Sequence, residues 1–102
     1  MTRQTQKKYN TRAKLIKALA HPTRLFIVEQ LSKQKECVCN LTEMVGVDIS
    51  TISKHLAILK KAGIVENRKE GLQVCYSLKT KCVKKLLNCI NHMTVATKPR
   101  KG

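Results

Sequence analysis

The sequence has few aromatic residues, few acids and no long apolar run. It contains no Trp, one Phe and two Tyr, and its apolar residues are mostly Leu, Ile, Val and Ala, which suit the packing of helices. No stretch approaches the roughly 18 apolar residues that can span a bilayer. The polar and basic start, Met1 to Tyr9, lacks the apolar core of a secretory signal. These absences predict a cytoplasmic protein that does not associate with membranes.

The scarcity of acids leaves a large excess of positive charge. The 102 residues include 21 Lys and Arg against 6 Asp and Glu, a net charge of +15. Most basic side chains lie in residues 1–35 and 79–102, which together contain one acid, Glu29. Such an excess favours a polyanionic partner, most often nucleic acid; the alternative is a charge that only keeps the protein soluble.

The sequence also lacks the residue sets on which enzymes depend. It has no paired carboxylates, no nucleophile with a neighbouring base and no glycine-rich loop that could cradle a phosphate. We therefore expect no enzymatic activity.

There are five cysteines: Cys37, Cys39, Cys75, Cys82 and Cys89. An odd number in a cytoplasmic chain argues against a disulfide scaffold and favours metal binding, thiol redox chemistry or simple burial.

A chain of this length has room for one small domain with a thin core, and oligomerisation would bury more surface. We expect a basic flexible arm over residues 1–10, a folded domain over residues 11–94 and a basic flexible tail over residues 95–102.

Apolar spacing and helix breakers predict four helices before residue 63. Pro22 ends one helix and begins the next, because proline cannot continue the hydrogen-bond ladder but fits a first helical position. Gly46 and Gly63 are typical helix ends, and Asp48 is a typical helix cap. The helices are expected over residues 11–20, 22–32, 38–45 and 49–62.

A hairpin and a last helix complete the expected fold. Val74, Tyr76 and Leu78 alternate with polar or small residues, the pattern of a half-buried strand. With a preceding strand and a polar loop over residues 67–71, this predicts a β-hairpin wing, followed by a helix over residues 80–94. The predicted class is mainly α with a small β-hairpin, in the order α-α-α-α-β-β-α. This is a winged helix-turn-helix, because two of the helices join through a short turn.

Four segments resemble signatures of the ArsR/SmtB family of metal-responsive repressors. They are Ala18–Leu25 (ALxDPTRL in the family), Glu36–Leu41 (ELCVCDL), Ser50–Leu56 (STVSRHL) and Leu59–Val65. His21 stands where the family usually has Asp. The resemblance covers residues 12–93. It implies a homodimer built on the first and last helices, which binds operator DNA without inducer and releases it when inducer binds.

The helix over residues 49–62 is expected to enter the major groove, where short polar and basic side chains can reach base edges. The candidates are Ser50, Thr51, Ser53, Lys54 and His55. Further cations are expected to contact phosphates: Arg24, Lys60, Lys61, Arg68 and Lys69. Ser50 and Thr51 have an alternative role in capping the helix. Ile49 stands where the family usually has Gln, which removes one adenine-reading side chain.

Cys37 and Cys39 are the candidate inducer site. In the family alignment they lie at the cap and in the first turn of the helix over residues 38–45, where two thiolates can converge on one ion. The positive end of the helix dipole favours thiolates there. Thiolates select soft ions, so we expect As(III), Sb(III) or a soft divalent metal such as Cd, Pb or Zn as inducer. No cofactor is expected to be needed for DNA binding.

A complete ligand set is not evident from the sequence. Arsenic-type members of the family often have a third cysteine where this chain has Thr42, and the first ten residues contain no Cys or His. Cys82 and Cys89 share one face of the last helix and are candidates for further ligands; their alternative role is packing at the dimer interface. Cys75 is expected to lie exposed on the outer face of the wing.

Two other functions remain open at this stage. The same thiols could form a redox or persulfide switch in a repressor of the same fold. Alternatively, the chain could be an architectural DNA-binding protein that senses nothing and binds without sequence preference.

Overall fold

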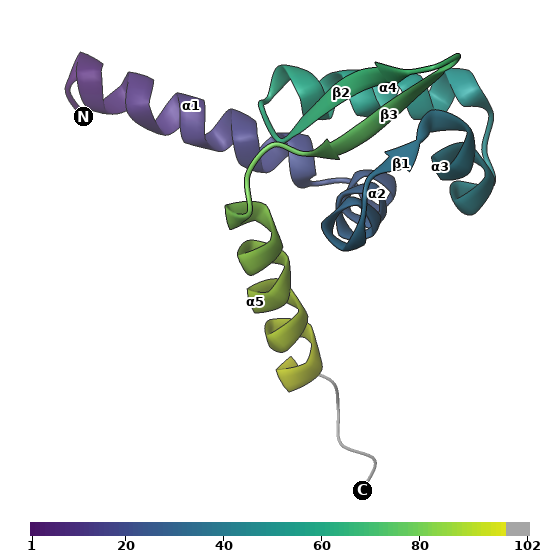
Figure 1. The fold of residues 1–102 in the computed structure, drawn as a ribbon. Helices are drawn as coiled ribbons and strands as arrows, with labels where there is room; N and C mark the ends of the chain where they lie inside the picture. The colour runs from purple at the N-terminus through teal and green to yellow at the C-terminus, as the bar shows by residue number, and fades with distance from the viewer. Residues whose placement is uncertain (98–102) are drawn as a thin grey trace, which may run out of the picture.

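The computed structural model describes residues 1–97, and their side chains as far as Val95 (Figure 1). Its helices are α1 (Arg3–Leu19), α2 (Pro22–Lys33), α3 (Val38–Val45), α4 (Ile49–Lys61) and α5 (Cys82–Thr97). Its strands are β1 (Glu36–Cys37), β2 (Val65–Glu70) and β3 (Gln73–Leu78). The mainly helical winged helix-turn-helix fold predicted from the sequence is confirmed. No helix in the described part is long and apolar enough to cross a membrane.

The expected flexible arm over residues 1–10 is wrong, because α1 already begins at Arg3. Thr2 caps this helix: its hydroxyl accepts a hydrogen bond of 3.2 Å from the backbone N–H of Thr5. Thr11, where this helix was expected to begin, lies inside it, and its hydroxyl donates to the Lys7 carbonyl. Gln, Lys and Arg are good helix formers, so the polar start extends the helix. At the other end, α5 continues to Thr97, and the rest of the expected tail lies outside the described residues.

The break between α1 and α2 lies at His21 and Pro22, as predicted. Pro22 is the first residue of α2, and the His21 ring caps the helix by accepting a 3.1 Å hydrogen bond at Nδ1 from the backbone N–H of Thr23. Histidine thus performs the capping role that a carboxylate more commonly performs.

The sheet has three strands in the order β1-β3-β2, all antiparallel. The hairpin of β2 and β3 turns tightly at Gly71, whose φ is 63°, so the predicted loop over residues 67–71 is wrong: β2 continues to Glu70. The sequence predicts no strand at Glu36 and Cys37, which form β1. This strand has two residues, too few for a periodic pattern, and it pairs Glu36 with Tyr76 and Cys37 with Cys75. Pairing with β1 makes β3 the central strand.

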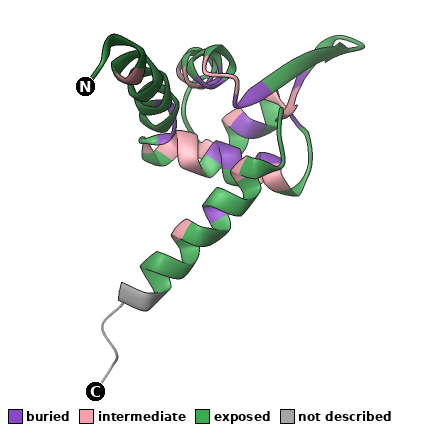
Figure 2. Cartoon of the chain, turned by 90° about the vertical axis from the view of Figure 1, so that its left-hand side faces the viewer, coloured by how far each residue is buried: buried purple, intermediate pink, exposed green. Residues whose placement is uncertain are grey.

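The core lies between α2, α3, α4 and the sheet. Its fully buried side chains come from these elements and from the segment before β2: Ile27, Val28, Leu41, Ile52, Leu56, Leu59, Ile64 and Val65. The outer helices contribute little: among the described side chains, α1 adds the buried Ala18 and Leu19, and α5 adds the buried Leu87 and the partly buried Val83. Figure 2 shows that most of α1 and α5 is exposed. The helix-turn-helix and the wing therefore form the rigid body, from which α1 and α5 project.

Replacing Leu56 with Ala should lower the free energy of unfolding by about 2–5 kcal/mol, because it leaves a cavity at a fully buried position of α4. The measurement is urea unfolding at fixed protein concentration, with Lys60→Ala on the exposed face of the same helix as the control. Equal losses in the two variants would contradict the placement of the core.

Candidate DNA-binding surface and thiol site

The turn between α3 and α4 orients the candidate recognition helix. Gly46 ends α3 in the left-handed region, with φ 79° and ψ 28°, a conformation that costs little only for glycine. Asp48 then precedes α4. The hydroxyls of Ser50 and Thr51 donate hydrogen bonds to its carboxylate, and these bonds lower the pKa of Asp48. The Asp48 side chain forms no capping hydrogen bond to the backbone of α4, so in the DNA-free structure Ser50 and Thr51 are bonded to Asp48 and do not themselves cap the helix.

The exposed face of α4 carries most of the predicted DNA-binding residues. Ile52, Leu56 and Leu59 are fully buried, which turns the opposite face outward. Five predicted residues are exposed: Ser50, Ser53, Lys54, Lys60 and Lys61. Thr51 and His55 are half-buried at the edge of this face. The geometry thus gives α4 one apolar face and one polar, basic face, as a helix that reads DNA requires.

The wing adds two further cations. Arg68 and Lys69 are exposed on β2, where they are paired with Cys75 and Val74 of β3. They were expected at the tip of the wing; they lie instead on the strand, because the turn begins only at Gly71.

A basic hollow links α4 to α1. It has a volume of about 550 Å³, and its cationic lining residues are Lys14, Lys17, Arg24 and Lys61. The sequence did not predict that Lys14 and Lys17 lie near Lys61, because these residues are more than forty positions apart in the chain. Their helical positions in α1 and the packing of α1 against α4 bring them together, so the positive surface extends beyond the helix-turn-helix.

Arg24 was predicted as a phosphate contact, but in this structure it ties three helices together. Its Nε donates a 2.6 Å hydrogen bond to the Ala18 carbonyl at the end of α1, and its Nη1 lies 3.3 Å from Nδ1 of His55 on α4. Arginine can only donate, so this contact requires an unprotonated Nδ1 on His55. Arg24 is half-buried, and its contacts hold the end of α1 and the middle of α4 next to α2.

The rings of His21 and His55 are in contact beside Arg24, with centroids 4.5 Å apart and planes tilted by 46°. Burial lowers the pKa of His55, and the charges of His21 and Arg24 lower it further. The folded protein thus favours the neutral ring, while the unfolded chain takes up a proton near the ordinary value of 6.5.

Stability should therefore fall as the pH drops below about 6.5, because the unfolded state then binds the proton that folded His55 resists. We expect the urea midpoint to decrease between about pH 7.5 and about pH 5.5, and to decrease less in His55→Gln. His92→Gln, an exposed histidine on α5, is the control and should keep the wild-type dependence. An undiminished dependence in His55→Gln would refute this assignment.

The cysteines are arranged differently from the expectation. Cys37 is half-buried at the cap of α3, and its Sγ lies 3.2 Å from Sγ of Cys75 and 2.8 Å from Oε1 of Gln73. Cys39 is exposed, and its Sγ lies 3.9 Å from Oδ1 of Asn40. The nearest thiol to Cys37 that the structure records is therefore on β3, not on α3.

Cys75 was expected to be exposed, and this was wrong: only 8% of it is accessible. The reason is β1, which pairs with β3 and covers the position. The hydrogen bond with Cys37, together with burial and the nearby Glu70 carboxylate, raises the pKa of Cys75 to about 12. Cys75 is therefore a protonated thiol at neutral pH.

A hollow of about 350 Å³ joins the predicted inducer site to the DNA-binding elements. Its lining residues come from the start of α3, from α4 and from the wing: Cys37, Val38, Cys39, Ile49, Ser53, Leu72, Gln73 and Val74. A ligand held by these cysteines would thus touch the same space as the start of the candidate recognition helix.

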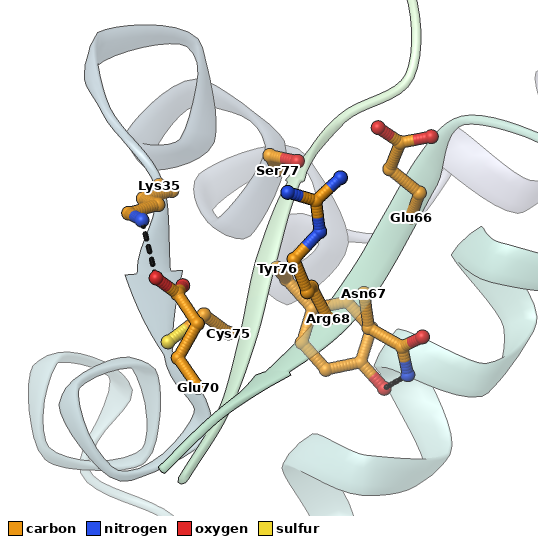
Figure 3. Close-up of a pocket in the computed structure, with 8 residues that line it drawn as sticks. All are labelled: Lys35, Glu66, Asn67, Arg68, Glu70, Cys75, Tyr76 and Ser77. Atoms are coloured by element: carbon orange, nitrogen blue, oxygen red, sulfur yellow. Dashed lines mark hydrogen bonds and ion pairs between the residues drawn. The ribbon is translucent and has the colours of Figure 1, made fainter.

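A second hollow, of about 270 Å³, reaches Cys75 from the face of the sheet shown in Figure 3. Four of its polar residues are engaged with one another: Lys35 forms a 2.6 Å ion pair with Glu70, and Asn67 donates to the hydroxyl of Tyr76. The thiol pair therefore lies between two hollows, with Cys37 lining one and Cys75 lining the other.

The described residues contain no group of three or more His, Cys, Asp or Glu side chains that could by itself hold a metal ion. Cys82 and Cys89 are exposed on α5, which projects away from α3 in Figure 1. The possible metal ligands that one chain provides near α3 are the sulfur atoms of Cys37, Cys39 and Cys75. This donor set fits a thiophilic ion and does not suit a hard one.

The fold and this surface define a winged helix-turn-helix DNA-binding protein. Residues 21–67 match the model of the bacterial regulatory proteins of the arsR family. The chain is 39% identical over 87 residues to an uncharacterized HTH-type transcriptional regulator of Methanocaldococcus jannaschii, covering 84% of this chain and 98% of that protein. The chain belongs to the arsR family and is a transcriptional repressor of that family, not an enzyme.

Two further relatives are informative. A homologue of the cadmium resistance transcriptional regulatory protein CadC from Staphylococcus aureus is 43% identical over 76 residues, which cover 74% of this chain and 63% of that protein. The homodimeric winged helix-turn-helix DNA-binding domain of Mb0332 from Mycobacterium bovis superposes with a TM-score of 0.83 at 26% identity, covering 92% of this chain and 87% of that one.

Proposed function

We propose that the chain is a homodimeric repressor that holds operator DNA with α4 and the wing and releases it when a thiophilic metal or metalloid ion binds at the start of α3. The observation that carries this proposal is the hollow in which Cys37 and Cys39 meet Ile49 and Ser53 of α4. An ion there would act directly on the recognition helix, with Cys37 and Cys39 as ligands.

Operator binding rests on charge and geometry. The exposed cations of α4 and β2 lie on the part of the molecule that winged helices direct at DNA. On this proposal Ser50, Thr51, Ser53, Lys54 and His55 approach bases, while Lys60, Lys61, Arg68 and Lys69 approach phosphates. Arg24 acts mainly by positioning α4, through its contact with His55.

The dimer rests on apolar surface that one chain leaves exposed. On α1 and α5 these side chains are Tyr9, Leu15, Ile16, Leu86, Met93 and Val95. Most of both helices lies outside the core (Figure 2), and contiguous apolar surface of this kind marks association sites. The Mycobacterium bovis domain, which is homodimeric, supports a homodimer here. Cys82 and Cys89 would then lie near the interface, where they can pack or add ligands.

Release follows from the connection between α3 and α4. The two helices are joined by the short turn after Gly46 and share the core through Leu41 and Ile52. A shift at the start of α3 is therefore transmitted to α4, because packed helices move as units. The relative named for cadmium resistance supports a soft metal as inducer.

Binding to a labelled fragment of the gene's own promoter should weaken steeply with salt. With 6–10 phosphate contacts, affinity falls by on the order of 10³ or more between 50 and 200 mM salt. Lys60→Ala should weaken binding and make the salt slope shallower by about 1, because the proposal places Lys60 at a phosphate. Lys84→Ala on the exposed face of α5 is the control. A slope near zero, or equal affinity for unrelated DNA, would contradict the proposal.

Titrating As(III), Cd(II) or Zn(II) into the reduced protein–DNA complex should release the DNA, which fluorescence anisotropy detects. Cys37→Ser and Cys39→Ser should each abolish release while leaving DNA affinity in the absence of ions within about twofold, since neither carries the charge that binds phosphate. Cys82→Ser and Cys89→Ser are matched controls that separate a ligand role on α5 from packing. Unchanged release in Cys37→Ser would disprove the assigned site.

A further inference from the structure

Cys37 and Cys75 are direct partners in the β1–β3 ladder. Opposed residues in antiparallel strands have Cα atoms about 4.5 or 5.5 Å apart, and both values lie in the range of about 4.4–6.8 Å found for disulfides. The two sulfur atoms are 3.2 Å apart, so an approach of about 1 Å would bring them to bonding distance. The backbone already holds both side chains on one face of the sheet.

No other pair among the five cysteines is arranged in this way. Cys39 follows Cys37 by two residues, and its recorded contact is with Asn40. Cys82 and Cys89 are seven residues apart on α5, which places them about 10 Å apart along the helix axis, beyond the reach of a disulfide. The five cysteines are all free in this structure.

Solvent reaches the pair from two sides. Cys37 is half-buried and lines the hollow next to α4, and Cys75 lines the hollow that contains Lys35 and Arg68. A molecule as small as a peroxide can therefore reach the thiol of Cys37. The thiol of Cys75 is buried next to it.

From this geometry we propose that Cys37 and Cys75 are a redox modification site, which a hydroperoxide converts to a disulfide between β1 and β3. The disulfide consumes the Cys37 sulfur, so the oxidised protein can no longer use it to hold an inducer ion. The first statement, that the disulfide forms, does not depend on the proposed function. The second statement, that the disulfide prevents binding of an inducer ion, rests on the proposed function.

The chemistry requires only the two thiols and the peroxide. The Cys37 sulfur attacks one peroxide oxygen, an S–O bond forms, the O–O bond breaks, and the leaving alkoxide or hydroxide takes a proton. The Cys75 sulfur then attacks the sulfenic sulfur, the S–S bond forms, and hydroxide leaves with the Cys75 proton as water. In total, two thiols lose two electrons and two protons, and the peroxide is reduced to an alcohol or water, plus water.

Mapping the disulfide tests the first statement without DNA or metal. The full chain is reduced, treated with one equivalent of hydrogen peroxide, alkylated and digested with trypsin without reductant. We expect the peptides 36–54 and 70–79 to be linked in most of the protein, and the link to be lost with dithiothreitol. Cys39→Ser should retain the link, although residue 39 lies in the same peptide, whereas Cys37→Ser and Cys75→Ser should lose it. A link from Cys37 to Cys39, a link between chains, or oxidation of Cys37 without a link would each overturn the proposal.

Cd(II) is the probe for the second statement. The oxidised protein should lose most of the cadmium–thiolate absorption that the reduced protein shows, and dithiothreitol should restore it. The Cys75→Ala variant should still bind Cd(II) after peroxide treatment, provided that Cys37 has not been over-oxidised. Alkylation of Cys37 in the same sample measures how much of it remains a thiol. If the disulfide forms while the reduced protein binds no Cd(II), the inducer proposal fails and the modification site stands. If Cd(II) binding is unchanged by a mapped disulfide, Cys37 is not a ligand.

Discussion

The pairing of β1 with β3 is the constraint on which the candidate sensing region depends. Two residues, Glu36 and Cys37, join the start of α3 to the central strand of the wing. Without this pairing, α3 and the wing would be linked only through the core. With it, Cys37 faces Cys75 and lines a hollow that also contains the start of α4. One short ladder thereby places a thiol, a helix of the helix-turn-helix and the wing in contact.

The division between core and outer helices sets what each part can do. Buried side chains concentrate in α2, α3, α4 and the sheet, so these elements behave as one packed body. By contrast, α1 and α5 expose apolar residues such as Ile16 and Met93. The thin core of a small domain explains this arrangement, because surface that a monomer cannot bury becomes available for a second copy.

The junction of α1, α2 and α4 is held by polar contacts rather than by apolar packing alone. Arg24 bonds to the last turn of α1 and to His55, and the tilted ring of His55 contacts that of His21. His21 stands where related repressors usually have Asp, yet it still caps α2. Because its ring also contacts His55, the cap of α2 lies directly against the recognition helix.

The sequence by itself determined the number and order of the helices, the helix-turn-helix, the hairpin and the polar face of α4, because these follow from local periodicity and from glycine and proline positions. It also determined the basic charge and the supply of five thiols. It did not determine the start of α1 or the length of β2. Only the tertiary structure decided which cysteines meet, since β1 is too short to leave a periodic signal and its partner lies 38 residues away. The same holds for the contact of Arg24 with His55, which joins positions 31 residues apart. The sequence shows which side chains are present and what chemistry they can perform. Which of them come together in space depends on contacts between distant segments, and no local pattern encodes these contacts.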